Sequence, residues 1–392
     1  MKTKLLEIIK NSPFIYSIYF YSISFVINFI KLFLKTDEKL VLFVAYGGRH
    51  FNDSPRTLYE AMQKDERFSN YKLVWAFRNP NDFDFVPNRI KIDTFEYFKT
   101  ALKSRVWITN VYIERGLYFK GIKTYYLHTT HTVFPKLMAS HALAAGNDNF
   151  SVKGGYHYDC SCAQSKYEQK MQAEMFDIPI DNVKLTGYPK NDVLINFPKE
   201  KKKQIRDTLG IAPDKIVILY APTYRDESKV TQSCPINFDL WNKVLGDKYV
   251  VLFRAHPVIV NMTHFDPNSN FVIDVSNYQV NTDLMAVADI LISDYSGIFF
   301  EFGVQEKPMF CYAYDYDDYI KTRGLYFDIR EKIPGGFMNE EELLNYIKSG
   351  DKNEIMKKVN EFRKEQITYY GNATEQCLNL ICDNLKNSNY CN

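Results

Sequence analysis

Residues 290–301 have the sequence ILISDYSGIFFE, and this stretch decides the fold. Its first residues form an apolar run too short for a helix, and after a turn the apolar residues from Ile298 onward are spaced as in a helix. A strand, a turn and a helix in this order are the repeating unit of a parallel α/β sheet. Such sheets bind ligands at the carboxyl ends of their strands, which here is the turn 294–297.

The same alternation continues along most of the chain. Short apolar runs predict one series of strands at 40–45, 72–77, 106–109, 123–127 and 158–163, and a second series at 216–221, 249–255, 271–274, 290–293 and 309–312. Helices are predicted between them at 54–64, 94–103, 284–288 and 299–303. Two series of this kind predict an α/β protein with two doubly wound, Rossmann-like domains that face each other across a cleft.

These patterns divide the chain of 392 residues into four parts. We assign an N-terminal helix to 1–36, a first Rossmann-like domain to 37–190 and a second to 191–338. Residues 339–392 are predicted to form helices that brace the two domains. The linker is expected near 189–203, where the lysine-rich stretch PKEKKK interrupts the pattern. We interpret those lysines as a solvated first turn of a helix, with a phosphate-binding patch as the alternative.

Composition argues against some functions. The formal net charge is only +2, so a general nucleic-acid binder is not expected. Seven scattered cysteines without a disulfide framework indicate a reducing compartment. Cys160 and Cys162 lie on one predicted strand, so we interpret them as buried thiols rather than metal ligands.

The N-terminal segment has the pattern of a membrane-associated helix. No charged residue lies between Pro13 and Ile30, and lysines flank the segment on both sides. Polar residues recur at steps of three and four along one stripe: Ser17, Tyr21, Ser24, Asn28, Lys31 and Lys35. The remaining surface is mostly aromatic and aliphatic, which favours a helix lying in a membrane interface. A membrane-spanning anchor and a helix packed on the protein's own core remain alternatives.

Polar side chains follow several strands of the predicted sheets. Ser296 and Gly297 begin a helix and could bind a phosphate, although Ser293 or Asp294 could instead merely cap that helix. Arg225 and His256 follow two other strands of the second series; a surface ion pair and a structural histidine are the alternatives for them.

In the first series, His128 and His131 follow the strand 123–127. One of them could act as a general base on an acceptor hydroxyl; a metal site is the weaker alternative, because no third ligand with suitable spacing lies nearby. The chain has no GxGxxG turn, Walker A motif or GxSxG elbow. The acidic stretch 315–318 resembles the acidic metal motif of some glycosyltransferases, but it is interpreted as a solvated loop.

In chain order, these pieces resemble the CDP-glycerol glycerophosphotransferase family of teichoic acid primases and polymerases. The resemblance covers roughly residues 40–335. It is carried by NDSPR at 52–56 with LYE at 58–60, TGYPKND at 186–192, YAPTYRD at 220–226, RAHP at 254–257, SDYSG at 293–297, KP at 307–308 and RGLYFD at 323–328. The family implies a GT-B fold, with an acceptor domain first and a nucleotide-donor domain second.

The resemblance also implies site residues. The catalytic base of the family lies in a WHGTPLK segment. The corresponding segment here is THTVFPK at 130–136, which retains the His and the Lys but lacks the Trp and the Gly. His131 would be the base and His256 would act on the pyrophosphate, as the two catalytic residues. The substrate-binding residues would be Thr130, Thr132, Lys136, Lys190, Tyr224, Arg225, Asp294, Ser296, Gly297 and Glu301. No metal and no cofactor are expected.

The activity implied by the resemblance is transfer of a polyol phosphate, most simply glycerol phosphate from CDP-glycerol with release of CMP. The acceptor would be a hydroxyl of a lipid-linked glycan or a teichoic acid-like or capsular polymer. The enzyme would be peripheral on the cytoplasmic side of the cell membrane, and a homo-oligomer stays open. The alternatives are a GT-B glycosyltransferase that uses a nucleotide sugar, and a non-catalytic membrane-attached binding protein of a polymer assembly complex.

Overall fold

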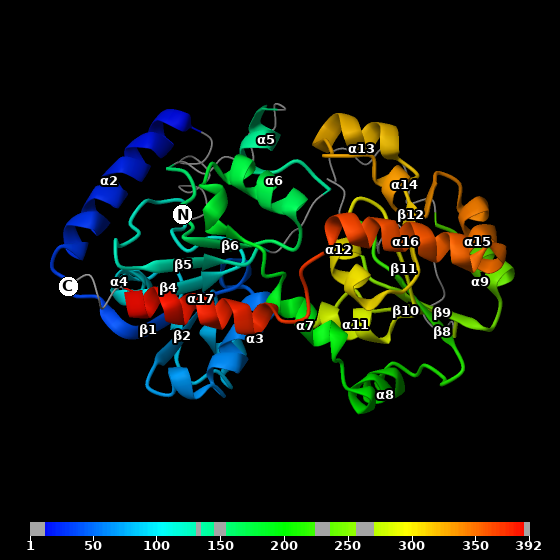
Figure 1. Cartoon of the computed structure of the whole chain (residues 1–392), viewed down its shortest axis with the longest axis horizontal. Helices are drawn as coiled ribbons and strands as arrows, with labels where there is room; N and C mark the ends of the chain where they lie inside the picture. Colours follow the sequence, from blue (N-terminus) through cyan, green and yellow to red (C-terminus); the bar gives the residue numbers. More distant parts are fainter. Residues whose placement is uncertain (1–11, 131–134, 145–153, 224–235, 256–269, 388–392) are drawn as a thin grey trace.

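The computed structural model describes residues 12–130, 135–144, 154–223, 236–255 and 270–387. Strands and helices alternate along the chain and form two sheets, one in each half of the molecule (Figure 1). The predicted α/β fold with two doubly wound sheets is confirmed.

The first sheet has seven strands in the order β3-β2-β1-β4-β5-β6-β7. Every neighbouring pair is parallel. The strands are β1 (Asp37–Val44), β2 (Lys72–Phe77), β3 (Arg89–Lys91), β4 (Ser104–Thr109), β5 (Tyr125–His128), β6 (Cys160–Cys162) and β7 (Val183–Lys184). The last five residues of β1 are all buried, because helices cover both faces of a parallel sheet. Cys160 and Cys162 are buried thiols, as predicted.

The second sheet has six parallel strands in the order β10-β9-β8-β11-β12-β13. The strands are β8 (Ile216–Tyr220), β9 (Tyr249–Phe253), β10 (Val272–Asp274), β11 (Ile290–Ser293), β12 (Met309–Tyr312) and β13 (Gly335–Phe337). In both sheets the strand order reverses direction beside the first strand of the series. This switch point is the place where open α/β sheets bind ligands.

The helices that matter for the site connect these strands. They are α3 (Asp53–Met62), α4 (Phe95–Lys103), α5 (Ala139–Ala144), α6 (Lys166–Phe176), α7 (Pro189–Ile195), α8 (Lys199–Thr208), α9 (Phe238–Leu245), α11 (Asn281–Val287), α12 (Ile298–Phe302), α13 (Tyr316–Arg323) and α14 (Ile329–Lys332). The chain crosses between the halves through α7 and α8. Helices α15 (Glu340–Ser349) and α16 (Lys352–Gln366) lie on the second half, and α17 (Ala373–Asn387) returns to pack on α3 and α7 (Figure 1).

The predictions missed three strands and several helices, and they interpreted the start of α13 as a loop. The missed strands, β3, β7 and β13, all lie at sheet edges and have three residues or fewer. Short edge strands lack the continuous apolar run of a strand buried on both faces, so their sequences give little signal. The acidic stretch 315–318 is not a loop: Tyr316 begins α13, with Asp317 and Asp318 in its first turn.

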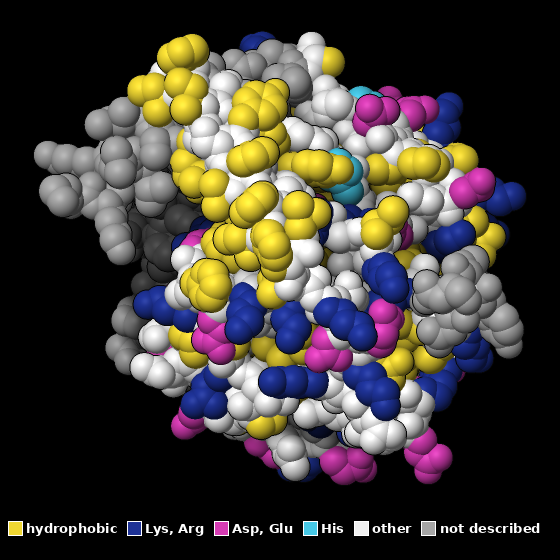
Figure 2. All heavy atoms as spheres, turned by 90° about the vertical axis from the view of Figure 1, so that its left-hand side faces the viewer, with side chains coloured by type: hydrophobic (Ala, Val, Ile, Leu, Met, Phe, Trp, Pro, Cys, Tyr) yellow, Lys and Arg dark blue, Asp and Glu magenta, His cyan; other side chains and the backbone are white. Residues whose placement is uncertain are grey.

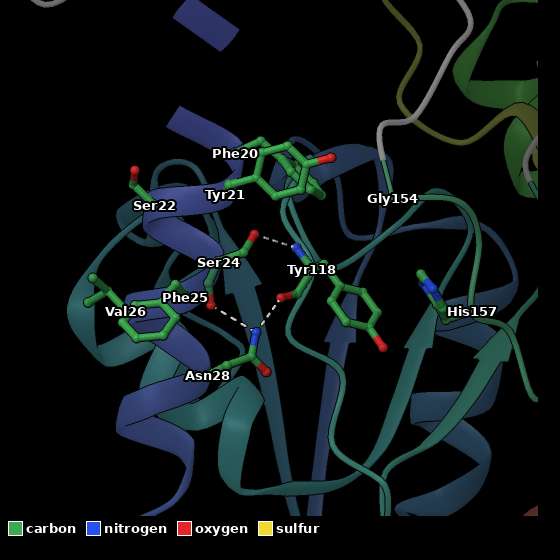
Figure 3. A pocket seen from close by; sticks show the side chains of 10 residues that line it. All are labelled: Phe20, Tyr21, Ser22, Ser24, Phe25, Val26, Asn28, Tyr118, Gly154 and His157. Carbon is green, nitrogen blue, oxygen red and sulfur yellow. Dashed lines mark hydrogen bonds between the residues drawn. The ribbon is translucent and has the colours of Figure 1, made fainter. Parts of the chain in front are cut away.

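The N-terminal helix α2 (Pro13–Lys31) lies along the outer side of the first half (Figure 1). The part of its polar stripe from Ser24 to Lys31 faces the protein, whereas Tyr21 is exposed. Ser24 Oγ accepts a hydrogen bond from the backbone N of Tyr118 at 3.0 Å, and Asn28 Nδ2 donates to the Tyr118 carbonyl at 2.7 Å (Figure 3). Lys31 Nζ donates to the carbonyl of Lys120 at 3.2 Å. The helix is therefore docked on the segment 116–120 by hydrogen bonds of its polar side chains.

The apolar side of α2 points outward. Its exposed side chains are Phe14, Ile15, Ile18, Tyr21, Phe25, Val26 and Phe29, followed by Leu32 and Phe33. Figure 2 shows hydrophobic side chains gathered over this face, with lysines and arginines along its lower border. By length and composition, the described residues contain one helix apolar enough to cross a membrane, Phe14–Lys31.

Candidate active site

A small pocket lies between the two halves, where residues from both switch-point regions meet. We call it the interdomain pocket; its volume is about 180 Å³. It is lined by Tyr46, Asn52, Asp53, Arg56, Thr57, Glu60, Lys190, Val193, Lys201, Val280, Asn281, Thr282, Asp283 and Glu301. Two of the predicted site residues, Lys190 and Glu301, are among them.

Lys190 connects the two halves through an ion-pair network. Its Nζ lies 3.2 Å from Asp53 Oδ2 in the first half and 2.9 Å from Glu301 Oε1 in the second. The side chains of Lys190 and Asp53 are each only 6% exposed. Asp53 and Glu301 are both far from Lys190 in sequence, so the fold brings these three groups together.

Burial and neighbouring charges act in opposite directions on this network. Burial disfavours the charged form of Lys190, but Asp53 and Glu301 more than offset that effect and raise its pKa. Burial raises the pKa of Glu301, an effect that Lys190 opposes and Asp53 reinforces. Lys190 is therefore a firmly charged group whose Nζ is held by two carboxylates.

The first-half side of the pocket has strained backbone. Tyr46 and Asp53 both have positive φ, at 48° and 63°, a region that side chains other than Gly rarely adopt. The Tyr46 hydroxyl donates to Asp53 Oδ2 at 2.7 Å, and Ser54 Oγ accepts from the backbone N of Lys190 at 3.3 Å. Such strain persists where surrounding contacts enforce it, and it is frequent at functional sites.

In the second half, Asp294 joins the two loops of the switch point. Its carboxylate accepts hydrogen bonds from the backbone N of Thr223 at 2.9 Å, after β8, and from its own neighbour Tyr295 at 2.6 Å. Ser296 Oγ accepts from the backbone N of Ile298 at 3.3 Å, and Gly297 is the N-cap of α12. The Asp294 carboxylate therefore fixes the loop shape, and the first turn of α12 starts from that loop.

The predicted first-half residues lie in two settings. Thr130 is buried and has a positive φ of 35°. Lys136 forms an isolated antiparallel bridge with Leu325, so this part of the predicted segment contacts the second half. His128, the reserve candidate for the base, is buried in the first core: its ring stacks on Tyr158 and its Nδ1 lies 3.1 Å from Ser161 Oγ.

Several predicted site residues lie outside the described residues: His131, Thr132, Tyr224, Arg225 and His256. Their roles stay predictions. Within the described ranges, no group of three or more His, Cys, Asp or Glu side chains is arranged to hold a metal ion.

Three residues of this region are not among the predicted site residues. Asp53 lies in the NDSPR motif, which was the only available signal, and Tyr46 lies just upstream of it. Arg254 follows β9, and its guanidinium donates to the carbonyls of Val275 at 3.1 Å and Tyr278 at 2.7 Å. It thereby fixes the backbone immediately before His256.

The chain is similar to proteins of teichoic acid synthesis. A teichoic acid glycerol-phosphate transferase of Staphylococcus aureus is 30% identical over 361 residues, which are 87% of this chain and 90% of that protein. A teichoic acid poly(glycerol phosphate) polymerase of Staphylococcus epidermidis is 33% identical over 321 residues. That match covers 77% of this chain but only 44% of the longer polymerase.

Solved structures agree with this similarity. A variant of the wall teichoic acid polymerase TagF superposes with a TM-score of 0.80 and 30% identity, covering 90% of each chain. A TagF variant soaked with CDPG gives a TM-score of 0.77. The family model described as CDP-glycerol:poly(glycerophosphate) glycerophosphotransferase matches residues 26–383. The chain therefore belongs to the CDP-glycerol:poly(glycerophosphate) glycerophosphotransferase family.

Proposed function

We propose that this protein transfers glycerol phosphate from CDP-glycerol to a hydroxyl group of a phosphate-bearing acceptor and releases CMP. The observation that carries the proposal is its similarity to TagF, which extends over 90% of both chains and includes a structure soaked with CDPG. The two sheets of the present chain place their switch points on either side of one pocket, an arrangement suited to a donor and an acceptor.

In the proposed reaction, His131 removes the proton of the acceptor hydroxyl. The hydroxyl oxygen attacks the phosphorus that bears glycerol, a new phosphodiester bond forms, and the bond to the CMP oxygen breaks. His256, Arg225 and the start of α12 at Ser296 stabilise the negative charge on the departing phosphate. Thr130, Thr132, Lys136 and Tyr224 would bind substrate, and no metal or cofactor is required.

The described residues support this scheme by positioning. Asp294 holds the loops after β8 and β11 together, and α12 starts from one of them. Lys190 was predicted to contact the donor, and Glu301 was predicted to be an acid of the substrate-binding site. In the structure Lys190 pairs with both Glu301 and Asp53, so we assign Lys190 and Glu301 the role of holding the two halves at the distance that the reaction needs.

We further propose that the protein binds the cytoplasmic face of the cell membrane through α2 as an interfacial helix. Spanning the bilayer would break the hydrogen bonds of Ser24, Asn28 and Lys31 to the segment 116–120 and move these side chains into hydrocarbon. Lying in the interface keeps those bonds and buries the exposed apolar side, on which Phe25 is 72% exposed.

The activity is tested with the purified full chain, CDP-glycerol and a synthetic lipid-linked acceptor. Mass spectrometry should show an acceptor that has gained glycerol phosphate, together with CMP. His131→Ala and His256→Ala should each abolish CMP release, whereas His264→Ala, a histidine without an assigned role, should not. Activity retained by the His131 variant would remove it as the base. Turnover of a UDP-sugar in place of CDP-glycerol would instead support the glycosyltransferase alternative.

Membrane binding is tested by sedimentation with phosphatidylglycerol vesicles. Phe25→Ser combined with Phe29→Ser should reduce the bound fraction strongly, whereas Ile180→Ser, which changes an exposed apolar residue elsewhere in the first half, should not. Alkaline carbonate should release the wild-type protein from cell membranes. Retention after carbonate treatment would contradict the interfacial arrangement and favour a spanning helix.

A further inference from the structure

Three arginines lie at the carboxyl edge of the first sheet, and the proposed reaction does not use them. Arg49 follows β1, Arg78 directly follows β2, and Arg115 lies in the segment after β4. We call Arg49, Arg78 and Arg115 the arginine cluster. Strands β1 and β4 are neighbours at the switch point of this sheet, so the cluster stands at the position where such sheets bind ligands.

Two glycines bring Arg78 and Arg115 close to the loop after β1, which also carries Arg49. Arg78 Nε donates to the carbonyl of Gly47 at 3.3 Å, and a Cβ atom on Gly47 would lie 3.3 Å from Arg115 Nη1. Gly48 has a φ of +81°, and a Cβ atom there would lie 3.0 Å from the backbone N of Arg78. The chain can therefore turn closely against the end of β2 only because glycine occupies these positions.

The cluster has more positive charge than its surroundings balance. Arg115 forms a two-point ion pair with Asp93, at 2.8 Å and 2.9 Å. Among the described residues, neither Arg49 nor Arg78 makes an ion pair with a carboxylate, and both are exposed. Partial burial lowers the pKa of Arg78, and the nearby charges of Arg49 and Arg115 lower it further, whereas Asp93 opposes this shift.

The cluster lies between the interdomain pocket and the helix α2. The loop that carries Arg49 continues directly to Asn52 and Asp53, which line the pocket. On the other side, Arg115 precedes Gly116, whose carbonyl accepts a hydrogen bond from the Tyr16 hydroxyl of α2 at 3.3 Å. A polymeric ligand that extends from a membrane surface at α2 into the pocket would therefore pass these guanidinium groups.

We propose that the arginine cluster binds phosphodiester groups of the acceptor chain behind its reacting terminal hydroxyl. This inference rests on the proposed function, because it takes the acceptor to be a polymer with one phosphate in each unit. Guanidinium groups bind phosphate oxygens through paired, charge-assisted hydrogen bonds, and exposed unpaired arginines at a ligand-binding edge suit that chemistry. Longer acceptors should therefore bind more tightly than a single glycerol phosphate unit.

The test uses a lipid-free oligomer of four glycerol phosphate units, with binding measured by calorimetry and no donor present. Arg49→Gln and Arg78→Gln should each raise its dissociation constant about tenfold, and the double variant should raise it further. Lys72→Gln is the matched control, because it removes one exposed positive charge at the opposite end of β2. The affinity for CDP-glycerol should be the same in all variants.

Two further outcomes separate this proposal from others. If the double variant loses binding to phosphatidylglycerol vesicles while its affinity for the oligomer is unchanged, the cluster binds lipid headgroups and the proposal is overturned. If the double variant transfers glycerol phosphate with an unchanged KM for the acceptor, the proposal fails while the proposed function stands. Tight, arginine-dependent oligomer binding by a protein that shows no transfer would support the cluster and contradict the proposed function.

Discussion

Two of the contacts between the halves of the molecule differ in chemistry. At the interdomain pocket, Lys190 is held between Asp53 and Glu301 by buried ion pairs, which we call the ionic contact. Near α5 and α13, shown at the top of Figure 1, the segments 135–141 and 324–326 meet mainly through the backbone, which we call the backbone contact. There, Tyr326 N donates to the Pro135 carbonyl at 2.8 Å.

This difference indicates how each contact can be altered. A buried ion pair is costly to break on one side, because the remaining charges stay buried without a partner. A backbone contact depends instead on conformation and space, so charge changes should leave it intact. The ionic contact reaches α12, and the backbone contact follows closely after His131 in sequence.

The largest effect is expected from Lys190→Ala. It leaves Asp53 and Glu301 as two buried carboxylates without their cation, which should lower the free energy of unfolding by about 3–5 kcal/mol. The chain offers a reporter for each half, because Trp75 and Trp107 lie in the first and Trp241 in the second, all buried. Denaturation followed separately in Trp241→Phe and in Trp75→Phe with Trp107→Phe should show the halves unfolding less cooperatively once Lys190 is removed.

The control for this variant removes all three charges together. Asp53→Asn, Lys190→Met and Glu301→Gln in one protein should regain much of the lost stability, because no unpaired charge is then buried. A loss below about 1 kcal/mol in Lys190→Ala would mean that water replaces the cation, and the ionic contact would then be no stronger than a surface ion pair.

A smaller effect, specific to the ionic contact, is expected from pH. Burial raises the pKa of Glu301 above its ordinary value of 4.5. The folded protein therefore binds this proton more tightly than the unfolded chain does. This contribution to stability is complete below pH 4.5 and is lost as pH rises through the raised pKa. The stability of the Glu301→Gln variant relative to wild type should therefore increase as the pH is raised from 4 to 7. Parallel pH profiles of unfolding would contradict this expectation.

The backbone contact is tested by adding volume rather than by changing charge. Gly324 has a φ of +69°, and a Cβ atom there would lie 2.6 Å from Leu137 Cδ1 across the contact. Gly210 has the same φ of +69° with nothing within 4 Å of its Cβ position, so Gly210→Ala measures the backbone strain alone. We expect Gly210→Ala to lower the free energy of unfolding by about 1–2 kcal/mol. Gly324→Ala should lower it by about 1–3 kcal/mol more than Gly210→Ala does. When Leu137→Ala is added to each glycine variant, it should restore stability to Gly324→Ala but not to Gly210→Ala.

Most of the fold could be predicted because parallel strands buried on both faces leave an unbroken apolar run. The predicted strands 72–77, 290–293 and 309–312 coincide with β2, β11 and β12. The missed strands β3 and β7 contain the charged residues Arg89, Lys91 and Lys184, whereas β13 begins with two glycines. All three lie at edges where only one neighbour pairs with them. Such a strand forms because the sheet beside it supplies its hydrogen bonds, and that information is not in its own residues.

The site could be predicted less completely, because its contacts join distant parts of the chain. Lys190 and Glu301 were both assigned to the site, but nothing in one sequence indicates that they pair with each other. Asp53 lies 137 residues from Lys190, and its carboxylate faces that lysine only with a backbone conformation that a sequence pattern does not reveal. Polar residues at strand ends are predictable from the strands, whereas the partner of each one depends on how the two halves meet.

The smallest effect is expected from Tyr326→Phe, which removes a side-chain part of the backbone contact. The Tyr326 hydroxyl lies 2.9 Å from His141 Nδ1 and 3.8 Å from Met175 Sδ. Loss of this hydroxyl should lower the free energy of unfolding by only about 1 kcal/mol, because the backbone hydrogen bond of Tyr326 to Pro135 remains. His141→Ala should cost a similar amount, and the double variant little more than either, since both remove the same interaction. If Tyr326→Phe instead uncoupled the unfolding of the two halves as Lys190→Ala is expected to do, the backbone contact would depend on this hydroxyl. The distinction between a contact held by charge and one held by backbone would then fail.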